Sequence, residues 1–382
     1  MVSANNGFMT SSKQWYANPA ARSFRTPPAP QEVLAFHQAA LGYSPTRLKE
    51  SRELATDLGV RQVFVKEESV RFGLPAFKMV GVLWSVYRIL SARTGEAGEN
   101  WSFDELADRF GGKLTLYCAT DGNHGRAVAH TASLFGLSAR VFVPSSISQA
   151  AKDGIRGEGA ELTEVQAPYD DVVPHADAAA EADPAGQLVQ DTAWEGYDQI
   201  PTWIVEGYST IFRELDSQLE DAGVAGPDVV VTPCGVGSLL QATVAHYRGN
   251  DRPTDTPQPS LLSVEPLEAG CLVESLNAGG RVSVETGSTH MAGLNCGTVS
   301  TIAWPVLRGG VDAAVLVPEN ADISAVHRLE ELGFDSGPCG AASLAGLHVA
   351  FDNPELRESM GVSGDSVVVL LSTESREANP LD

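Results

Sequence analysis

A single lysine, Lys78, interrupts the apolar stretch RFGLPAFKMVGVLW at residues 71–84. Most lysines beside apolar surface keep the ammonium group in water. Pro75 suits the first turn of a helix, so the run predicts a helix from Ala76 to Leu90 with Lys78 in its first turn. Desolvation and the positive end of the helix would both lower the pKa of Lys78 and favour a neutral amine. A buried neutral amine can form a Schiff base with a carbonyl cofactor.

A glycine-rich loop, TPCGVGSLLQA (232–242), follows a predicted strand and opens a predicted helix. Gly235 and Gly237 allow a ligand to approach the backbone closely, and a helix N-terminus favours an anion. An ordinary β–α turn would have a similar pattern. A dinucleotide-binding loop would need a third glycine where this chain has Leu240, and Glu265 lies further away than the ribose-binding acid of such loops. We therefore favour a compact phosphate-binding loop.

A second loop, within CATDGNHGRAVAH (118–130), concentrates polar groups between a predicted strand and a predicted helix. Asp121, Asn123 and His124 lie in it, with Gly122 for a tight turn. Exposed backbone N–H groups in such a loop can bind a carboxylate. Turn-forming Asp and Asn also occur without function, but the concentration of polar groups favours a binding site.

Two small hydroxyl residues, Ser372 and Thr373, end the last predicted strand in VVVLLSTES. Such residues are usually structural, although in a cofactor site one of them could meet the ring nitrogen of a pyridine. The histidines and cysteines have none of the spacings C-x-x-C, H-x₃-H or H-E-x-x-H, so the sequence predicts no metal site. Whether Cys271 and Cys296 pair is left open.

Short β-branched runs alternate with helical patterns from about residue 61 onward. Strands are expected at 61–68, 114–120, 139–144, 160–165, 187–192, 227–233, 261–266, 313–318 and 365–373, with helices after most of them; residues 1–30 are expected to form an irregular arm. This alternation predicts an α/β protein with parallel strands covered by helices on both faces. We expect a small α/β lobe at 91–191, inserted into a large lobe of 1–90 plus 192–382. Ligands in such folds bind at the carboxyl ends of the strands, where the loops described above lie.

Composition and net charge indicate which kinds of molecule the protein could bind. The chain has 382 residues, of which 43% are hydrophobic and 20% charged, as in ordinary globular proteins. The net charge of −23 argues against nucleic acid and against an anionic membrane surface as partners. An odd number of cysteines without a recognisable secretion signal suits a reducing, cytoplasmic compartment.

Together these motifs resemble the fold-type II pyridoxal phosphate enzymes and, within them, the diaminopropionate ammonia-lyases. The resemblance runs from about residue 31 to 375 and is carried by VKEESVRFGLPAFKMVG, ATDGNHGRAVA, VQDTAWEGYDQIPTWIVEGY, SVEP and MAGLNCG. It implies two open parallel α/β lobes with the active site in the cleft between them, pyridoxal phosphate as cofactor and a homodimer. It also implies α,β-elimination of D- and L-2,3-diaminopropionate to pyruvate and two ammonia.

The resemblance further implies roles for single residues. Lys78 would hold the cofactor, and Lys78 and Asp121 would be acid–base groups on opposite faces of the substrate Cα. Asp191 would contact the substrate's amino group or assist its departure. The cofactor would also meet Phe77, Asn123 at the ring hydroxyl, Gly235, Val236, Gly237, Ser238 and Leu239 around the phosphate, and Ser372 or Thr373 at the ring nitrogen. The substrate would meet Thr120, Asp121, Gly122, His124 and Asp191.

Cys234, Pro75, SGPCG (336–340) and STES depart from the family pattern and leave the exact substrate open. One alternative is a serine or threonine dehydratase-type lyase on the same scaffold, but such enzymes have a serine-like residue where this chain has Asp121. A nicotinamide oxidoreductase would leave Lys78 without a role. A binding protein without catalytic activity would not need the lysine, the aspartates and the phosphate loop together.

Overall fold

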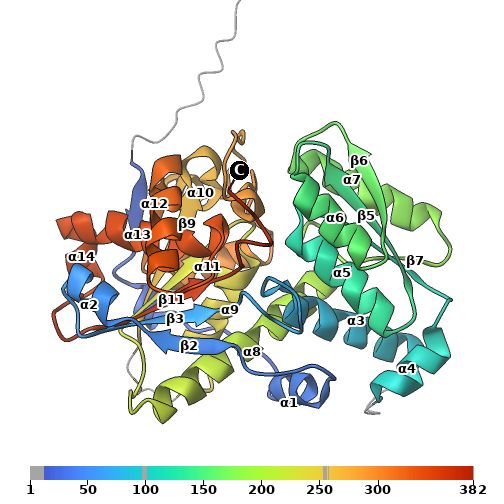
Figure 1. Ribbon diagram of the computed structural model, residues 1–382, viewed down its shortest axis with the longest axis horizontal. Helices are drawn as coiled ribbons and strands as arrows, with labels where there is room; N and C mark the ends of the chain where they lie inside the picture. The colour runs from blue at the N-terminus through green and yellow to red at the C-terminus, as the bar shows by residue number, and fades with distance from the viewer. Residues whose placement is uncertain (1–12, 97–100, 253–255, 257, 382) are drawn as a thin grey trace, which may run out of the picture.

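Two separate sheets organise the protein (Figure 1). The structure is a computed structural model, and it describes residues 13–96, 101–252, 256 and 258–381. Within these residues, seven strands form one sheet in the order β1-β10-β9-β8-β11-β3-β2, and four form the other in the order β6-β5-β4-β7. Only β1 and β2, at the two edges of the large sheet, pair antiparallel with their neighbours. The predicted α/β class with two parallel sheets is confirmed.

The bounds of the elements are as follows. The large sheet contains β1 (Trp15–Ala17), β2 (Arg47–Glu50), β3 (Gln62–Glu67), β8 (Val229–Pro233), β9 (Ser260–Pro266), β10 (Ala313–Val317) and β11 (Val367–Ser372). The small sheet contains β4 (Thr115–Ala119), β5 (Ser138–Pro144), β6 (Glu161–Val165) and β7 (Gly186–Leu188). The helices are α1 (Glu32–Ala39), α2 (Arg52–Leu58), α3 (Lys78–Thr94), α4 (Phe103–Phe110), α5 (Asn123–Leu134), α6 (Gln149–Gly157), α7 (Tyr169–Ala182), α8 (Gln199–Asp221), α9 (Ser238–Tyr247), α10 (Cys271–Ala278), α11 (Ala303–Gly310), α12 (Glu319–Glu331), α13 (Pro338–Asp352) and α14 (Pro354–Ser359). Short 3-10 turns are η1 (Ala21–Ser23), η2 (Leu267–Ala269) and η3 (Ala292–Leu294).

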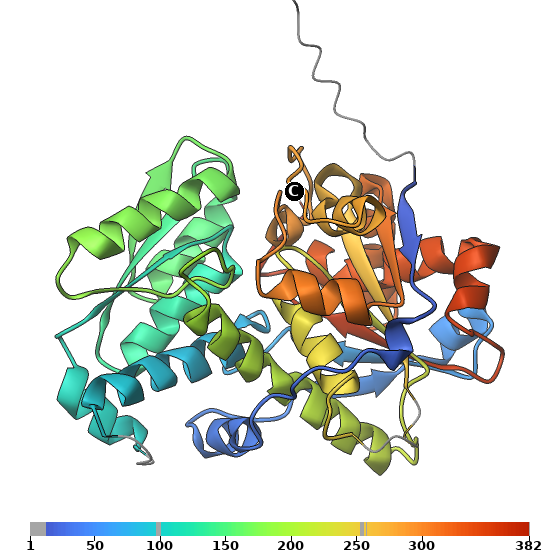
Figure 2. The ribbon, with the colours of Figure 1, turned by 180° about the vertical axis from the view of Figure 1, so that it is seen from behind.

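The central strands of the large sheet are buried on both faces. Successive side chains of a strand point to opposite faces, so Val229 and Val231 pack with α13 while Val230 packs with the core on the other face. That second core also contains Leu116 and Val141 of the small sheet. Figure 2 shows the long helix α8 running from the large lobe toward the small one. The two sheets therefore share apolar contacts through the helices between them.

Every strand predicted from the sequence is present, but the N-terminal expectation is wrong in part. Trp15–Ala17 form β1, which pairs with β10 in the register Trp15↔Val315, instead of an irregular arm. Residues 1–12 of that expected arm lie outside the described residues. The small sheet falls inside the predicted insertion at 91–191; the exact lobe boundaries stay a prediction, since α3 packs against both α8 and α5. None of the described helices is long and apolar enough to cross a membrane.

The helix that carries Lys78 begins later than predicted. α3 starts at Lys78 itself, so Pro75 lies outside the helix. The backbone before it pairs with the chain after β11: the Phe77 N–H donates to the Thr373 carbonyl, and the Ser375 N–H donates to the Pro75 carbonyl. This pairing keeps residues 75–77 out of the helix and places Lys78 beside the carboxyl end of β11.

A buried ion network joins β3, the loop after it and α8. Arg71 Nη1 donates to Glu214 Oε1 at 2.6 Å and Arg71 Nε to Glu68 Oε2 at 2.8 Å, while Lys66 Nζ donates to Glu214 Oε2 at 2.8 Å. All four side chains are buried. Burial alone would raise the pKa of Glu214, but the hydrogen bond and charge of Arg71, with those of Lys66, outweigh it and hold that pKa below its ordinary value.

We predict that Glu214→Gln lowers the free energy of unfolding by about 3–5 kcal/mol, because it leaves two buried cations without their shared carboxylate. Urea unfolding at neutral pH measures this. Asp57→Asn is the control, since it removes an exposed ion pair with Arg328 of 2.7 Å that should contribute less than about 1 kcal/mol. Because the pKa of Glu214 is lower in the folded protein than its unfolded value of about 4.3, the ionised carboxylate stabilises the fold at pH values above that value. The difference in unfolding free energy between wild type and Glu214→Gln should therefore shrink as the pH falls below about 4.3. A pH-independent difference would contradict this.

Candidate active site

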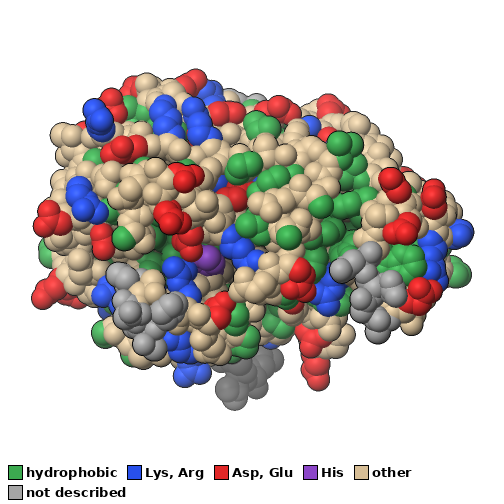
Figure 3. All heavy atoms as spheres, turned by 90° about the horizontal axis from the view of Figure 1, so that it is seen from below, with side chains coloured by type: hydrophobic (Ala, Val, Ile, Leu, Met, Phe, Trp, Pro, Cys, Tyr) green, Lys and Arg blue, Asp and Glu red, His purple; other side chains and the backbone are tan. Residues whose placement is uncertain are grey.

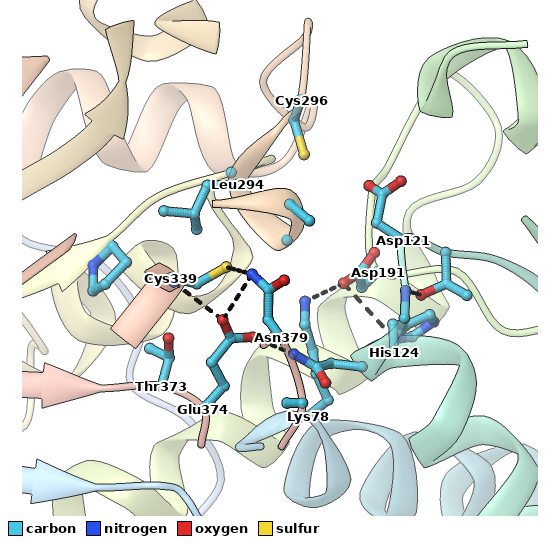
Figure 4. A pocket seen from close by; sticks show the side chains of 18 of the residues that line it. Lys78, Asp121, His124, Asp191, Leu294, Cys296, Cys339, Thr373, Glu374 and Asn379 are labelled. Atoms are coloured by element: carbon cyan, nitrogen blue, oxygen red, sulfur yellow. Dashed lines mark hydrogen bonds and ion pairs between the residues drawn. The ribbon is translucent and has the colours of Figure 1, made fainter. Parts of the chain in front are cut away.

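A cavity opens between the two lobes at the carboxyl ends of strands from both sheets (Figure 4). It contains about 1030 Å³ of space without protein atoms, part of it open to solvent. The cavity is lined by Phe77, Lys78, Thr120–His124, Asp191, the 233–239 loop, Ala292–Leu294, Cys296, Thr373, Glu374 and Asn379, among others. Of the residues predicted for the site, all but Ser372 line this cavity.

Lys78 and Asp191 form an ion pair at the centre of the cavity. Lys78 Nζ donates to Asp191 Oδ2 at 2.6 Å, across 113 residues of sequence. Burial opposes both charges, but their mutual attraction outweighs it: the pKa of Asp191 falls to about 2, and the pKa of Lys78 rises above its ordinary value. The prediction of a neutral amine is therefore wrong for this state of the protein. The prediction considered burial and the positive helix end, which lower the pKa of Lys78, but not the Asp191 carboxylate, which raises it.

His124 lies beside this pair and presents a lone pair to it. Its Nε2 donates to the Val189 carbonyl at 2.8 Å, which fixes the proton on that nitrogen. Its Nδ1 has no hydrogen-bond partner among the described residues and lies 3.7 Å from Asp191 Oδ2. Burial lowers the pKa of His124, so the ring is neutral. His124 Nδ1 and Asp191 Oδ2 are thus two neighbouring hydrogen-bond acceptors, and one cationic amine could donate to both.

The loop after β4 is closed by one side chain. Thr120 Oγ1 accepts hydrogen bonds from the Gly122 N–H at 2.9 Å and the Gly125 N–H at 3.1 Å. Gly122 has φ +147°, a conformation that side-chain-bearing residues rarely adopt. The loop holds Asp121 at the upper side of the cavity (Figure 4). Burial, followed by the charges of Asp170 and Asp191, raises the pKa of Asp121 well above its ordinary value.

The glycine loop after β8 forms a cradle for an anion. Gly237 has φ +98° and precedes the first residue of α9, whose leading N–H groups have no partner within the helix. A Cβ on Gly235 would lie 3.1 Å from Cys296 Sγ and from the Gly293 carbonyl oxygen, so a larger residue there would crowd both neighbours. Ser238 Oγ donates to the Asp191 carbonyl, which ties α9 to the catalytic segment. The hydroxyl proton of Ser238 is thus already used in this hydrogen bond, and the predicted contact of Ser238 with a phosphate stays a prediction.

The two hydroxyl residues after β11 point in different directions. Thr373 lines the cavity, whereas Ser372 is fully buried and its Oγ donates to Ser336 Oγ at 2.8 Å. Thr373 is therefore the one that can face a ring in the cavity. Glu374 follows it and accepts hydrogen bonds from Asn123 Nδ2 and, at 3.1 Å, from the Cys339 N–H. The predicted bond from Asn123 to a ring hydroxyl stays a prediction.

Several cavity residues were missed by sequence reasoning. Glu374 follows Ser372 and Thr373 directly, so the strand-end rule could have found it. Cys296 lies in MAGLNCG, which was recognised as a motif without a role for any residue. Tyr169, Leu294, Cys339 and Asn379 line the cavity as well. Leu294 belongs to MAGLNCG too and Cys339 to SGPCG, whereas Tyr169 and Asn379 come from segments without a local signal.

Two open questions from the sequence are answered. Glu265 is fully buried, and its carboxylate accepts hydrogen bonds from the Leu272 and Val273 N–H groups at 2.7 and 2.8 Å. It therefore caps α10 and is not free to bind a ribose, which removes the support for a nicotinamide site. All five cysteines, Cys271 and Cys296 included, are free and buried.

The donor set fits pyridoxal phosphate. The cavity offers an amine on Lys78, an anion cradle at the start of α9 and a hydroxyl on Thr373, from three parts of the chain. The fold and this site define a pyridoxal phosphate-dependent enzyme. In agreement, residues 39–374 match the model of a protein family that is described as 'Pyridoxal-phosphate dependent enzyme'.

Relatives narrow the class further. The chain is 34% identical over 356 residues to the diaminopropionate ammonia-lyase of Escherichia coli strain K12, covering 89% of this chain and 86% of that protein. Crystal structures of the E. coli enzyme match with TM-scores of 0.84 and 0.85 at 32% and 31% identity, covering 95% of this chain and 94% of theirs. The first holds an aminoacrylate–pyridoxal phosphate azomethine intermediate and the second D-serine. The chain belongs to the diaminopropionate ammonia-lyase family.

We predict that Lys78→Ala removes the absorbance near ~420 nm that borohydride reduces in the purified holoenzyme, because that band is expected of a lysine Schiff base. Lys113→Ala is the control, since Lys113 is exposed and its Nζ only donates to the Arg109 carbonyl. Absorbance scans before and after borohydride decide the question. A reducible band that survives in Lys78→Ala would show that another amine holds the cofactor.

Proposed function

We propose that the protein eliminates the β-amino group of D- and L-2,3-diaminopropionate and releases pyruvate and two ammonia after addition of water. The observation that carries this proposal is the pair of carboxyl groups, Asp121 and Asp191, that share one cavity with Lys78. The amine on Cβ of this substrate is a cation when protonated. An anionic side chain beside Cβ stabilises such a leaving group better than a hydroxyl would.

The cofactor supplies the electron sink: bound pyridoxal phosphate accepts the electron pair left on Cα when its proton is removed. The chain's own residues handle the protons. We infer that Lys78 acts on one face of Cα and Asp121 on the other. The raised pKa of Asp121 suits a group that takes up and returns a proton near neutral pH.

We assign binding of the β-amino group to Asp191 and His124. Asp191 is ionised in the ion pair with Lys78, which holds its pKa near 2, and its Oδ2 lies 3.7 Å from the unpaired His124 Nδ1. The cationic amine of the substrate would take the place of the Lys78 ammonium beside it. A protonated amine placed between these two atoms could donate to both and leave as ammonia. Once the cofactor engages Lys78, the carboxylate of Asp191 is free for this contact.

The remaining roles follow from position. We propose that the 235–239 loop and the start of α9 bind the phosphate, that Phe77 and Asn123 contact the ring, and that Thr373 rather than Ser372 faces its nitrogen. A neutral hydroxyl there stabilises a charged ring nitrogen less than a carboxylate would, which favours elimination over transamination. The Thr120–His124 loop is assigned to the substrate carboxylate through the N–H groups of Asn123 and His124 that begin α5, because those of Thr120 and Gly122 already donate within the fold.

The second candidate is a serine or threonine dehydratase-type lyase. It uses the same scaffold, and its leaving group is a hydroxyl instead of an amine. Asp121 distinguishes the two, because a D-isomer needs a base on the face opposite to Lys78. Pyruvate or ketobutyrate release from diaminopropionate, serine and threonine compares the candidates directly. Faster turnover of L-serine or L-threonine than of diaminopropionate would favour the dehydratase.

We predict that Asp121→Asn lowers kcat/KM for D-diaminopropionate by about 10²–10⁴, the usual contribution of a general base, and lowers that for the L-isomer much less. Pyruvate release with each isomer measures the ratio. Asp171→Asn is the control, as Asp171 is an exposed carboxylate at the start of α7. Equal losses for the two isomers would refute the assignment of opposite faces to Asp121 and Lys78.

We also propose that the protein works as a homodimer in the cytoplasm. Five free, buried cysteines suit a reducing compartment. On the face seen from below, where α1 and α8 lie, hydrophobic side chains gather between charged ones (Figure 3). Leu41, just after α1, is 92% exposed, and Val70 is 66% exposed. Light scattering that gives the mass of a single 40.4 kDa chain would contradict the dimer.

A further inference from the structure

Three side chains with metal-ligating atoms converge outside the catalytic cavity. His290 precedes η3, and Glu319 and Asp322 lie in the first turn of α12. His290 Nδ1 is 3.0 Å from Glu319 Oε2 and 3.7 Å from Asp322 Oδ2, and one ligand atom from each residue lies within 4.8 Å of the others. The spacing rules applied to the sequence miss this group, because His290 is far from the other two along the chain.

Asp322 is a fully buried acid in the first turn of α12. Apart from the backbone N–H groups of its own helical turn, neither Oδ1 nor Oδ2 has a hydrogen-bond partner in the described part of the chain. Glu319 Oε1 is buried and unpartnered in the same way. Buried polar atoms nearly always have partners, since leaving a carboxylate oxygen without one is costly. Three carboxylate oxygens of Glu319 and Asp322 are thus buried without a side-chain donor, beside the His290 ring.

We propose that His290, Glu319 and Asp322 bind a divalent transition-metal cation such as Mn²⁺ or Zn²⁺. One imidazole and two carboxylates suit these ions better than Ca²⁺, which prefers oxygen ligands alone. The two carboxylates neutralise the ion's charge. His290 is 48% exposed, so the ion can enter from solvent, and water can complete its coordination.

The cation site is connected to the wall of the catalytic cavity. The His290 N–H donates to Glu319 Oε2 at 2.9 Å, and the His290 carbonyl accepts from Asn379 Nδ2 at 2.7 Å. Asn379 lines the cavity, as do Ala292, Gly293 and Leu294 directly after His290. A bound ion would therefore hold residues 290–294 against α12. The hydrogen bonds of the His290 N–H and carbonyl already fix the position of this segment.

The test is Mn²⁺ binding to the pyridoxal phosphate-loaded enzyme after treatment with EDTA, counted by loss of the free-ion electron paramagnetic resonance signal. We expect one ion per chain in the wild type. Asp322→Asn and His290→Gln should each weaken binding by at least about tenfold, as expected when a metal site loses a ligand. His130→Gln is the matched control: His130 Nδ1 also pairs with a carboxylate, Glu158, at 2.8 Å, but no third ligand joins them.

Thermal unfolding gives a second readout. Without metal, Asp322→Asn should be at least as stable as the wild type, because it removes an unpaired buried charge. Added Mn²⁺ should raise the midpoint of the wild type and of His130→Gln only. If Asp322→Asn does not fold, the half-exposed His290→Gln still tests the site. A wild type that binds neither Mn²⁺ nor Zn²⁺, or equal binding in all variants, would overturn the proposal and leave His290 and the α12 N-terminus as the stabilisers of the two carboxylates.

Discussion

The ion pair between Lys78 and Asp191 is the interaction on which the site depends. Either charge alone would be costly in this buried position, and together they offset most of that cost. Lys78 is the first residue of α3, and Asp191 follows the last strand of the small sheet, so the pair joins the two lobes. Ser238 then ties the Asp191 backbone to the start of α9. The amine, the carboxylate and the phosphate cradle are therefore positioned as one unit.

The same cavity moves the pKa values of two chemically identical side chains in opposite directions. Asp191 is held ionised by Lys78, whereas Asp121 keeps a raised pKa because it is buried near other carboxylates and accepts no comparable partner. Two carboxyl groups whose environments move their pKa values apart are a recurrent basis for acid–base catalysis. Here the difference arises from which loop each residue occupies. The His124 ring adds a neutral acceptor beside the ionised carboxylate.

The framework beneath the cavity is stabilised by a second set of charges. Lys66 and Arg71, which come shortly before α3 in the chain, both donate hydrogen bonds to Glu214 of α8. This network sets α8 against β3, and α3 packs against α8 in turn. The position of Lys78 thus depends on a polar network remote from the cofactor cradle. One apolar core, which includes Phe77, Cys234 and Leu239 of the cleft, continues into both lobes.

The sequence by itself determined the strands, the class of fold and most of the residues that line the cavity. Runs such as VVVLL can only be strands buried on both faces, and the loops at their carboxyl ends must meet at one edge of the sheet. Asp121 and Gly235 were found in this way, and Lys78 was found from its apolar neighbours at the start of a predicted helix. β1 and the true start of α3 were not, because pairing with distant strands decided both.

Only the tertiary structure decided the charge on Lys78, which of Ser372 and Thr373 lines the cavity, and the group formed by His290, Glu319 and Asp322. Each depends on a partner that is remote in sequence: Asp191 lies 113 residues from Lys78, and Ser336 lies 36 residues from Ser372. Local patterns record burial and periodicity, which neighbouring residues share. Charge state and side-chain direction are set by whichever atoms the folded chain brings within a few ångströms, and no local pattern contains that information.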